Sequence, residues 1–148
     1  KNLSLASYIS KLARFSSFSK NDLLEIVCSN NFLFFGINDK FAGKKLEQTV
    51  MIVGLKSYEI ASENGTTLEF GCLGENVLLD FDPHSLEIGT NLIIGDSIIE
   101  ITQVCTVCNH LAVFNENLPL LLKGHRGVYC KIIKSGNISK DMLVKIQG

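Results

Sequence analysis

Hydrophobic residues recur in short runs along the chain, and most of these runs have the alternating or β-branched pattern of strands. The pattern predicts strands at residues 47–53 (EQTVMIV), 66–70 (TTLEF) and 76–81 (NVLLDF). Between the first two, residues 55–65 (LKSYEIASENG) are predicted to form a short helix that ends at Asn64-Gly65. Residues 89–102 (GTNLIIGDSIIEIT) contain two β-branched runs separated by Gly95-Asp96, which indicates a hairpin.

The last part of the chain has the same character. Residues 127–136 (GVYCKIIKSG) and 142–146 (MLVKI) are predicted to form a strand–turn–strand unit, with the polar segment SGNISKD as its connection. Alternation within 127–134 places Val128, Cys130 and Ile132 on one face of the strand. The spacing therefore predicts Cys130 as a core residue.

The first forty residues allow two interpretations. Residues 3–9 (LSLASYI) and 22–28 (DLLEIVC) have the composition of strands, whereas residues 19–27 (SKNDLLEIV) also fit a short helix capped by Ser19 or Asn21. Many short strands, glycine-rich turns and few helices favour a mainly β barrel or sandwich. The length of 148 residues and the absence of a linker or repeat favour one domain over residues 1–148.

Composition narrows the class of protein. Apolar residues make up 46% of the chain and charged residues 20%, which argues against disorder, and the formal net charge of −1 argues against a nucleic-acid partner. The longest apolar stretches, at 32–37 and 118–122, are too short to span a membrane, and no secretory signal is evident. With five cysteines, an odd number, we expect free thiols and a cytoplasmic protein.

The segment TQVCTVCNHL (102–111) contains a CxxC pair, Cys105 and Cys108. A structural zinc site would add two ligands from His110, His125 and Cys130, but no second CxxC or HxxxH follows. A thioredoxin-like redox pair belongs at the start of a helix in a βαβ unit, whereas this pair follows a hairpin. Three interpretations stay open: one reactive cysteine that a loop presents to a ligand, two buried thiols without chemistry, or a structural zinc site.

Three further segments contain candidate binding residues. Gly74-Glu75-Asn76 forms a turn between predicted strands that offers N–H groups and an amide, although a plain turn is the alternative. His125 and Arg126 precede a glycine that enters a strand, where an arginine can bind a phosphate or stabilise a thiolate, although an ordinary surface charge is the alternative. Asp39-Lys40 is bracketed by glycines in FFGINDKFAGK (34–44), and on its own this segment reads as a loop.

Taken together and in this order, these segments resemble the MOSC family, named for the C-terminal domain of molybdenum-cofactor sulfurases. The resemblance is strongest over residues 36–146. It rests on GINDKFAGK, LGEN, the hairpin LEIGTNLIIGDSIIEITQ with the cysteine loop after it, and HRGVYCKIIKSGNI. Phe41 replaces the usual histidine, Cys105 falls where an arginine is common, and Lys140 stands where a glycine is expected.

The resemblance implies a small β-barrel of the pyruvate kinase β-domain type with a few short helices. It also implies a molybdenum cofactor (molybdopterin) and a reactive cysteine, Cys108, which acts either as the molybdenum ligand in reduction of N-hydroxylated compounds or as a persulfide sulfur carrier. Because a thiolate is the reactive form, a cation such as Arg126, Lys40 or protonated His125 would assist Cys108. Arg126 and the Gly74-Glu75-Asn76 turn would hold the pterin, while Cys105 would attack the persulfide of Cys108 to release the outer sulfur.

The implied partners are a small-molecule substrate or cofactor and an electron-donor or sulfur-donor protein, because no flavin, haem or iron–sulfur motif is visible. The activity class would be a molybdenum-dependent oxidoreductase or a sulfur transferase. The departures at Phe41 and Cys105 keep an alternative open, a non-catalytic cofactor-binding or adaptor module.

Overall fold

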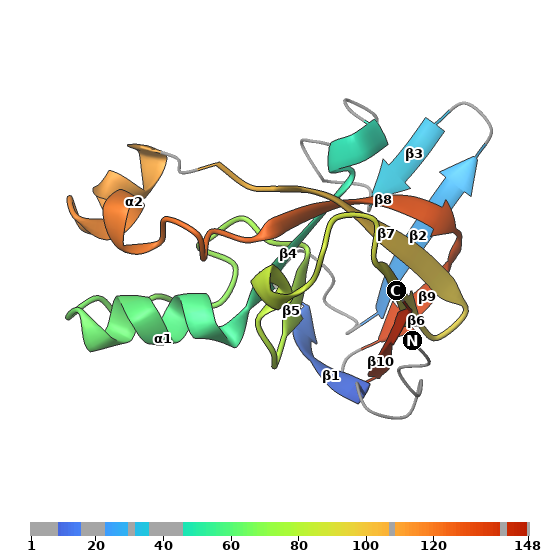
Figure 1. Ribbon diagram of the computed structural model, residues 1–148, viewed down its shortest axis with the longest axis horizontal. Coiled ribbons are helices and arrows are strands. Elements are labelled where there is room, and N and C mark those ends of the chain that lie inside the picture. The colour runs from blue at the N-terminus through green and yellow to red at the C-terminus, as the bar shows by residue number, and fades with distance from the viewer. Residues whose placement is uncertain are drawn as a thin grey trace.

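The computed structural model describes residues 9–15, 23–29, 32–35, 46–106, 109–139 and 142–147. Ten strands and two short α-helices, with three 3₁₀ turns between them, make up this part of the chain (Figure 1). The strands are β1 (Ile9–Phe15), β2 (Leu23–Ser29), β3 (Phe32–Phe35), β4 (Val50–Gly54), β5 (Val77–Leu79), β6 (Asn91–Ile94), β7 (Ser97–Val104), β8 (Val128–Lys134), β9 (Gly136–Ser139) and β10 (Leu143–Gln147). The helices are α1 (Leu55–Glu63) and α2 (Leu118–Leu121), and the 3₁₀ turns are η2 (Leu46–Gln48), η3 (Pro83–Ser85) and η4 (Asn109–Val113).

Among these strands, seven close into a barrel in the order β1-β10-β6-β7-β8-β4-β5, and a separate sheet has the order β3-β2-β9. The mainly β barrel with short helices that the sequence predicted is therefore confirmed. Strands β4 and β5 run parallel, and α1 lies in the connection between them. No helix in the described ranges is long and apolar enough to cross a membrane.

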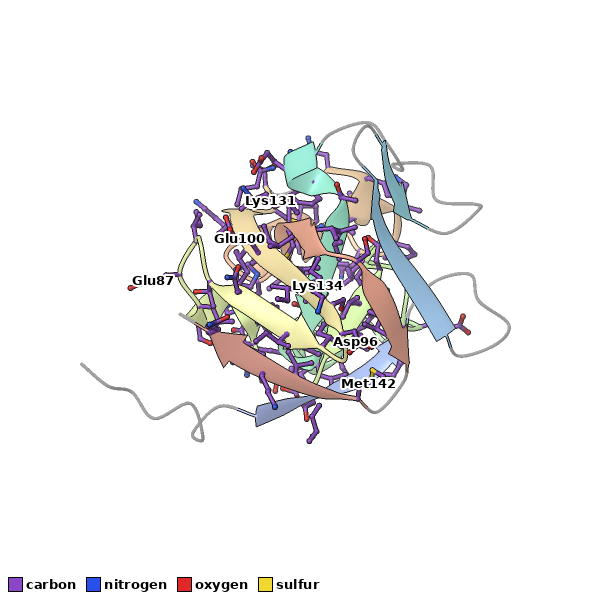
Figure 2. All side chains as sticks on the ribbon, turned by 90° about the vertical axis from the view of Figure 1, so that its right-hand side faces the viewer. Glu87, Asp96, Glu100, Lys131, Lys134 and Met142 are labelled. Carbon is purple, nitrogen blue, oxygen red and sulfur yellow. The ribbon has the colours of Figure 1, made fainter. Side chains whose placement is uncertain are left out.

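The barrel interior is filled by the inward positions of these strands. Val128, Cys130 and Ile132 point into this core, as the alternation predicted. On β7 and β8 two outward positions carry charge: Glu100 on β7 lies beside Lys131 on β8 with 3.5 Å between Oε1 and Nζ (Figure 2). This part of the barrel wall is therefore apolar on its inner face and polar on its outer face.

A second apolar cluster lies outside the barrel, where α1 and α2 sit next to each other at one end of the molecule (Figure 1). It joins the outer face of β4 and β5 to the helices and includes Met51, Val53, Tyr58, Leu73, Cys105, Leu111 and Leu118. The chain leaves the barrel after β7, forms η4 and α2, and returns at β8, and this part of the chain contributes Leu111, Leu118 and Leu122 to the layer.

Several sequence predictions are confirmed with shifted ends. The predicted helix 55–65 is α1, the hairpin 89–102 is β6 and β7 around Gly95, and the strands at 47–53, 76–81, 127–136 and 142–146 correspond to β4, β5, β8 and β10. Of the two alternatives for residues 19–28, the strand is correct, since β2 pairs with β3 and β9. Residues 3–8 lie outside the described ranges, and β1 begins at Ile9.

Two predictions are wrong. Residues 66–70 form no strand: Thr66 donates its backbone N–H to Ala61 O at 2.9 Å, and the segment returns the chain from α1 to β5 without a neighbouring strand. The segment 135–141 is not a simple connection, because β9 lies within it and pairs with β2. Strand β10, which follows β9 in the chain, pairs with β1 and β6.

Candidate functional site

The end of β7 and the start of β8 are neighbours, which brings the cysteine loop next to Arg126. Val104 pairs with Val128 across the two strands. One residue further out, the backbone N–H of Cys105 donates to the carbonyl oxygen of Gly127 at 2.9 Å. The start of the cysteine loop is therefore attached to the residue that follows Arg126.

Cys105 is a buried thiol. Its side chain belongs to the apolar cluster under the helices and is only 5% exposed. Burial raises the pKa of this thiol to about 12, although the charge of Arg126 and a hydrogen bond with Tyr129 act in the opposite direction. The protonated form therefore prevails at neutral pH, which does not favour Cys105 as a nucleophile.

Cys108, the predicted reactive cysteine, lies outside the described residues, as do Asp39, Lys40 and Phe41. The described residues on either side of the Val107-Cys108 pair, Thr106 and Asn109, are both exposed, and η4 begins at Asn109. The cysteines whose side chains are described, Cys72, Cys105 and Cys130, are free thiols.

Arg126 links the cysteine loop to the Gly74-Glu75-Asn76 turn. One guanidinium nitrogen, Nη1, donates to the carbonyl oxygen of Leu73 at 2.6 Å. The Nε atom of the same guanidinium is buried and has no hydrogen-bond partner among the described residues. Arg126 thus brings a positive charge and a buried donor to the site.

Glu75 is almost completely buried, with 1% of its surface exposed. Tyr58 donates its hydroxyl to Oε1 of Glu75, and the Gly71 N–H donates to the same oxygen at 3.1 Å. Burial raises the pKa of the Glu75 carboxyl above its usual range, while these hydrogen bonds and the charge of Arg126 lower it. The carboxyl therefore joins α1 to the turn before β5.

Asn76 and Gly74 shape the same turn. Asn76 accepts the Met51 N–H on its Oδ1 and donates its own backbone N–H to the Met51 carbonyl, each at 2.9 Å. Gly74 has φ +82°, which a residue with a side chain rarely adopts, and its N–H donates to Gly71 O at 2.9 Å. The predicted binding triplet is thus fixed to β4 by the side chain of Asn76 and to α1 by that of Glu75.

His125, a candidate from the sequence, lies next to Asp82 and His84, and the sequence did not indicate this group of three. Its Nδ1 lies 3.5 Å from Oδ2 of Asp82, and its ring is edge-on to that of His84 with 5.9 Å between centroids. Burial lowers the pKa of His84; the nearby Asp82 raises it and His125 lowers it further. The Asp82-Pro83 pair, a helix-start signal, predicts the η3 turn but not its contact with the 125–127 segment.

The residues that the structure describes contain no group of three or more His, Cys, Asp and Glu side chains that could hold a metal ion. Cys130, one ligand of the alternative zinc set, is fully buried in the barrel core. Burial also raises the pKa of this thiol well above its usual range.

Comparison with known proteins identifies the family. Residues 38–145 match the model of the MOSC domain. No curated protein matches the sequence of the chain.

Solved structures with a similar fold have low sequence identity to this chain. The YuaD protein from Bacillus subtilis has a TM-score of 0.68 at 16% identity, with 94% of this chain and 96% of that chain covered. YiiM from Escherichia coli has a TM-score of 0.69 at 15% identity, with 94% and 70% covered. YiiM from Geobacillus stearothermophilus has a TM-score of 0.62 at 17% identity and covers 70% of this chain, which spans 56% of that protein's length.

Proposed function

The chain belongs to the MOSC domain family, and from this premise we propose that it binds a molybdenum–pterin cofactor through the sulfur of Cys108 and the guanidinium of Arg126. The family match covers the cysteine loop, the Gly74-Glu75-Asn76 turn and the Arg126-Gly127 segment together.

The observation that carries the proposal is the environment of Arg126. Its Nη1 is fixed by Leu73 O at 2.6 Å, while its buried Nε has no partner among the described residues. A buried, positively charged donor of this kind suits an anionic group such as the phosphate of a pterin. The chemistry of the donor set therefore fits the cofactor.

The remaining predicted residues have supporting roles in the proposal. Glu75 and Asn76 use their described side-chain contacts to hold the turn, so the turn would contribute its backbone rather than its carboxylate. His125 directly precedes Arg126 in the chain, and a protonated imidazole ring at this position would add positive charge. Asp39 and Lys40 would complete the site from the first family segment.

A bound molybdenum centre would supply the two-electron chemistry by which N-hydroxylated compounds are reduced. The chain's contribution is to hold that group: a soft thiolate at Cys108 suits molybdenum better than a carboxylate would. Arg126 would orient its anionic part, and the apolar layer under α1 and α2, which includes Cys105, would limit the access of water from one side.

The burial of the Cys105 thiol favours a second candidate function, that of a sulfur carrier. In that reaction the Cys108 thiolate attacks the outer sulfur of a donor persulfide; the new S–S bond forms on Cys108 and the donor leaves as a thiolate, so no net electrons are exchanged. Because the nearby Cys105 thiol is buried and its pKa is raised to about 12, it would not resolve the new persulfide quickly. This favours storage of sulfur over its release by attack of Cys105 on the persulfide.

Turnover separates these candidates. Protein from a host that makes the cofactor is supplied with reduced viologen and an N-hydroxylated purine, beside Cys108→Ser and a matched thiol control, Cys72→Ser. Reduction that Cys108→Ser abolishes and Cys72→Ser retains supports the oxidoreductase. A sulfane-sulfur adduct on Cys108 without reduction supports the carrier, and cofactor binding with neither activity supports the adaptor module. If Cys108→Ser keeps reduction, sulfur loading and cofactor binding, the assignment of this cysteine is contradicted.

A further inference from the structure

The backbone of Gly127 is held on both sides of its Cα atom. Its N–H donates to Nε2 of His84 at 2.9 Å, and its carbonyl oxygen accepts from the Cys105 N–H at 2.9 Å. Gly127 has φ +123°, and a Cβ atom at this position would lie 2.7 Å from the carbonyl oxygen of Ile52. The backbone at this point therefore has little freedom, and Arg126 is the residue immediately before it.

His84 is itself rigidly placed. The η3 turn begins at Pro83, and the carboxylate of Asp82 caps it by accepting the His84 backbone N–H at 3.0 Å. Gly54 brings the end of β4 close to this turn, since a Cβ there would meet Phe81 O at 2.6 Å and Pro83 Cδ at 2.9 Å. The imidazole is thus presented to Gly127 by a turn that is packed against the barrel.

The direction of the hydrogen bond determines the proton state of the ring. Because Nε2 accepts, it carries no proton, and a neutral ring has its proton on Nδ1. Protonation of Nε2 would replace the acceptor with a second donor facing the Gly127 N–H. Among the described residues, the titratable groups that face the ring are Asp82, which favours the charged form, and His125, which disfavours it.

We infer that His84 is a positioning residue, which holds the Arg126-Gly127 segment through the Gly127 amide and releases it when Nε2 is protonated. The contacts that carry this inference are the 2.9 Å bond to Gly127, the capped η3 turn and the crowded backbone around Gly127. The inference goes beyond the proposed function and does not depend on it, because it concerns only the chain's own residues.

NMR titration of the full chain tests this inference without any cofactor. In the wild type, the Gly127 amide and the Arg126 Nε–H resonances should shift with the same midpoint as the His84 ring, below the usual value for histidine. Glutamine retains an acceptor oxygen but cannot be protonated near neutral pH, so His84→Gln should abolish both titrations. His84→Ala should let the Gly127 amide exchange with solvent roughly tenfold faster, as expected for one lost hydrogen bond.

The other two histidines of the chain provide the controls. His125→Gln and exposed His110→Gln should retain the titration of Gly127, because neither accepts its N–H. A Gly127 resonance that follows His125, or that still titrates in His84→Gln, would overturn the inference. A titration of Gly127 that leaves the Arg126 resonance unmoved would overturn the positioning role. His84→Gln keeps the test valid even where His84→Ala does not fold.

Discussion

The backbone N–H of Cys105 donates to the carbonyl oxygen of Gly127 at 2.9 Å, across the ends of β7 and β8. This bond lies between the two segments that the proposed site needs, the cysteine loop and Arg126. Whatever moves Gly127 therefore also moves the first residue of that loop.

Gly127→Ala should strongly destabilise the protein. The new Cβ would lie 2.7 Å from Ile52 O in a residue with positive φ, so we expect a loss of about 2–5 kcal/mol in the free energy of unfolding. Gly124→Ala is the matched control, because Gly124 has φ +79° with no atom within 4 Å, and it should lose about 1–2 kcal/mol. Chemical denaturation measures both; equal losses would show that the close approach to Ile52 is not costly.

At acidic pH, where the Glu75 carboxyl is protonated, Glu75→Gln should stay close to the wild type in stability, because an amide oxygen can still accept from Tyr58 and Gly71. Glu75→Ala should lose about 1–3 kcal/mol, since the buried Tyr58 hydroxyl loses its acceptor.

The same pair of variants has a pH dependence of known sign. Burial raises the pKa of Glu75, so its contribution to stability is present below the unfolded-state pKa and is lost as the pH rises through the folded-state pKa. Relative to the wild type, Glu75→Gln should therefore gain stability as the pH is raised. Exposed Glu69→Gln should show no such gain. A gain in Glu75→Gln on acidification instead would contradict the assigned direction.

Cys105 should resist alkylation in the folded protein. With a pKa of about 12, on the order of 0.01% of this thiol is ionised at pH 8, and its side chain is buried as well. Mass spectrometry after iodoacetamide treatment should find Cys105 and Cys130 modified only after denaturation, and half-buried Cys72 modified earlier. Labelling of Cys105 at the rate of an exposed thiol would exclude the buried state.

Features that depend on neighbouring residues in the sequence could be predicted, while those that depend on distant ones could not. The hairpin around Gly95 and helix α1 follow from local patterns, and both were predicted. The partner of a strand is set by the whole barrel, so the predicted strand–turn–strand unit of β8 and β10 did not identify β1 and β6 as the partners of β10. Strand β9 was missed because its polar sequence resembles a turn.

In the candidate site, too, the segments could be identified from the sequence, whereas the contacts between distant residues could not. The family resemblance identified the segments of Cys108, Arg126 and Glu75, and the MOSC family match confirms the family. The bonds of Tyr58 to Glu75 and of His84 to Gly127 join residues that are 17 and 43 positions apart. No local pattern in the sequence indicates either pair, so the buried state of Glu75 and the role of His84 required the structure.

The central claim, that Cys108 holds a molybdenum–pterin group beside Arg126, is tested most directly by measuring molybdenum and pterin in the purified protein. Wild type and Cys72→Ser from a cofactor-producing host should each contain about one molybdenum and one pterin per chain, whereas Cys108→Ser should lose the metal. Arg126→Gln should weaken pterin retention more than Arg126→Lys does, because lysine keeps the charge. Equal metal and pterin contents in the wild type and Cys108→Ser would contradict the account.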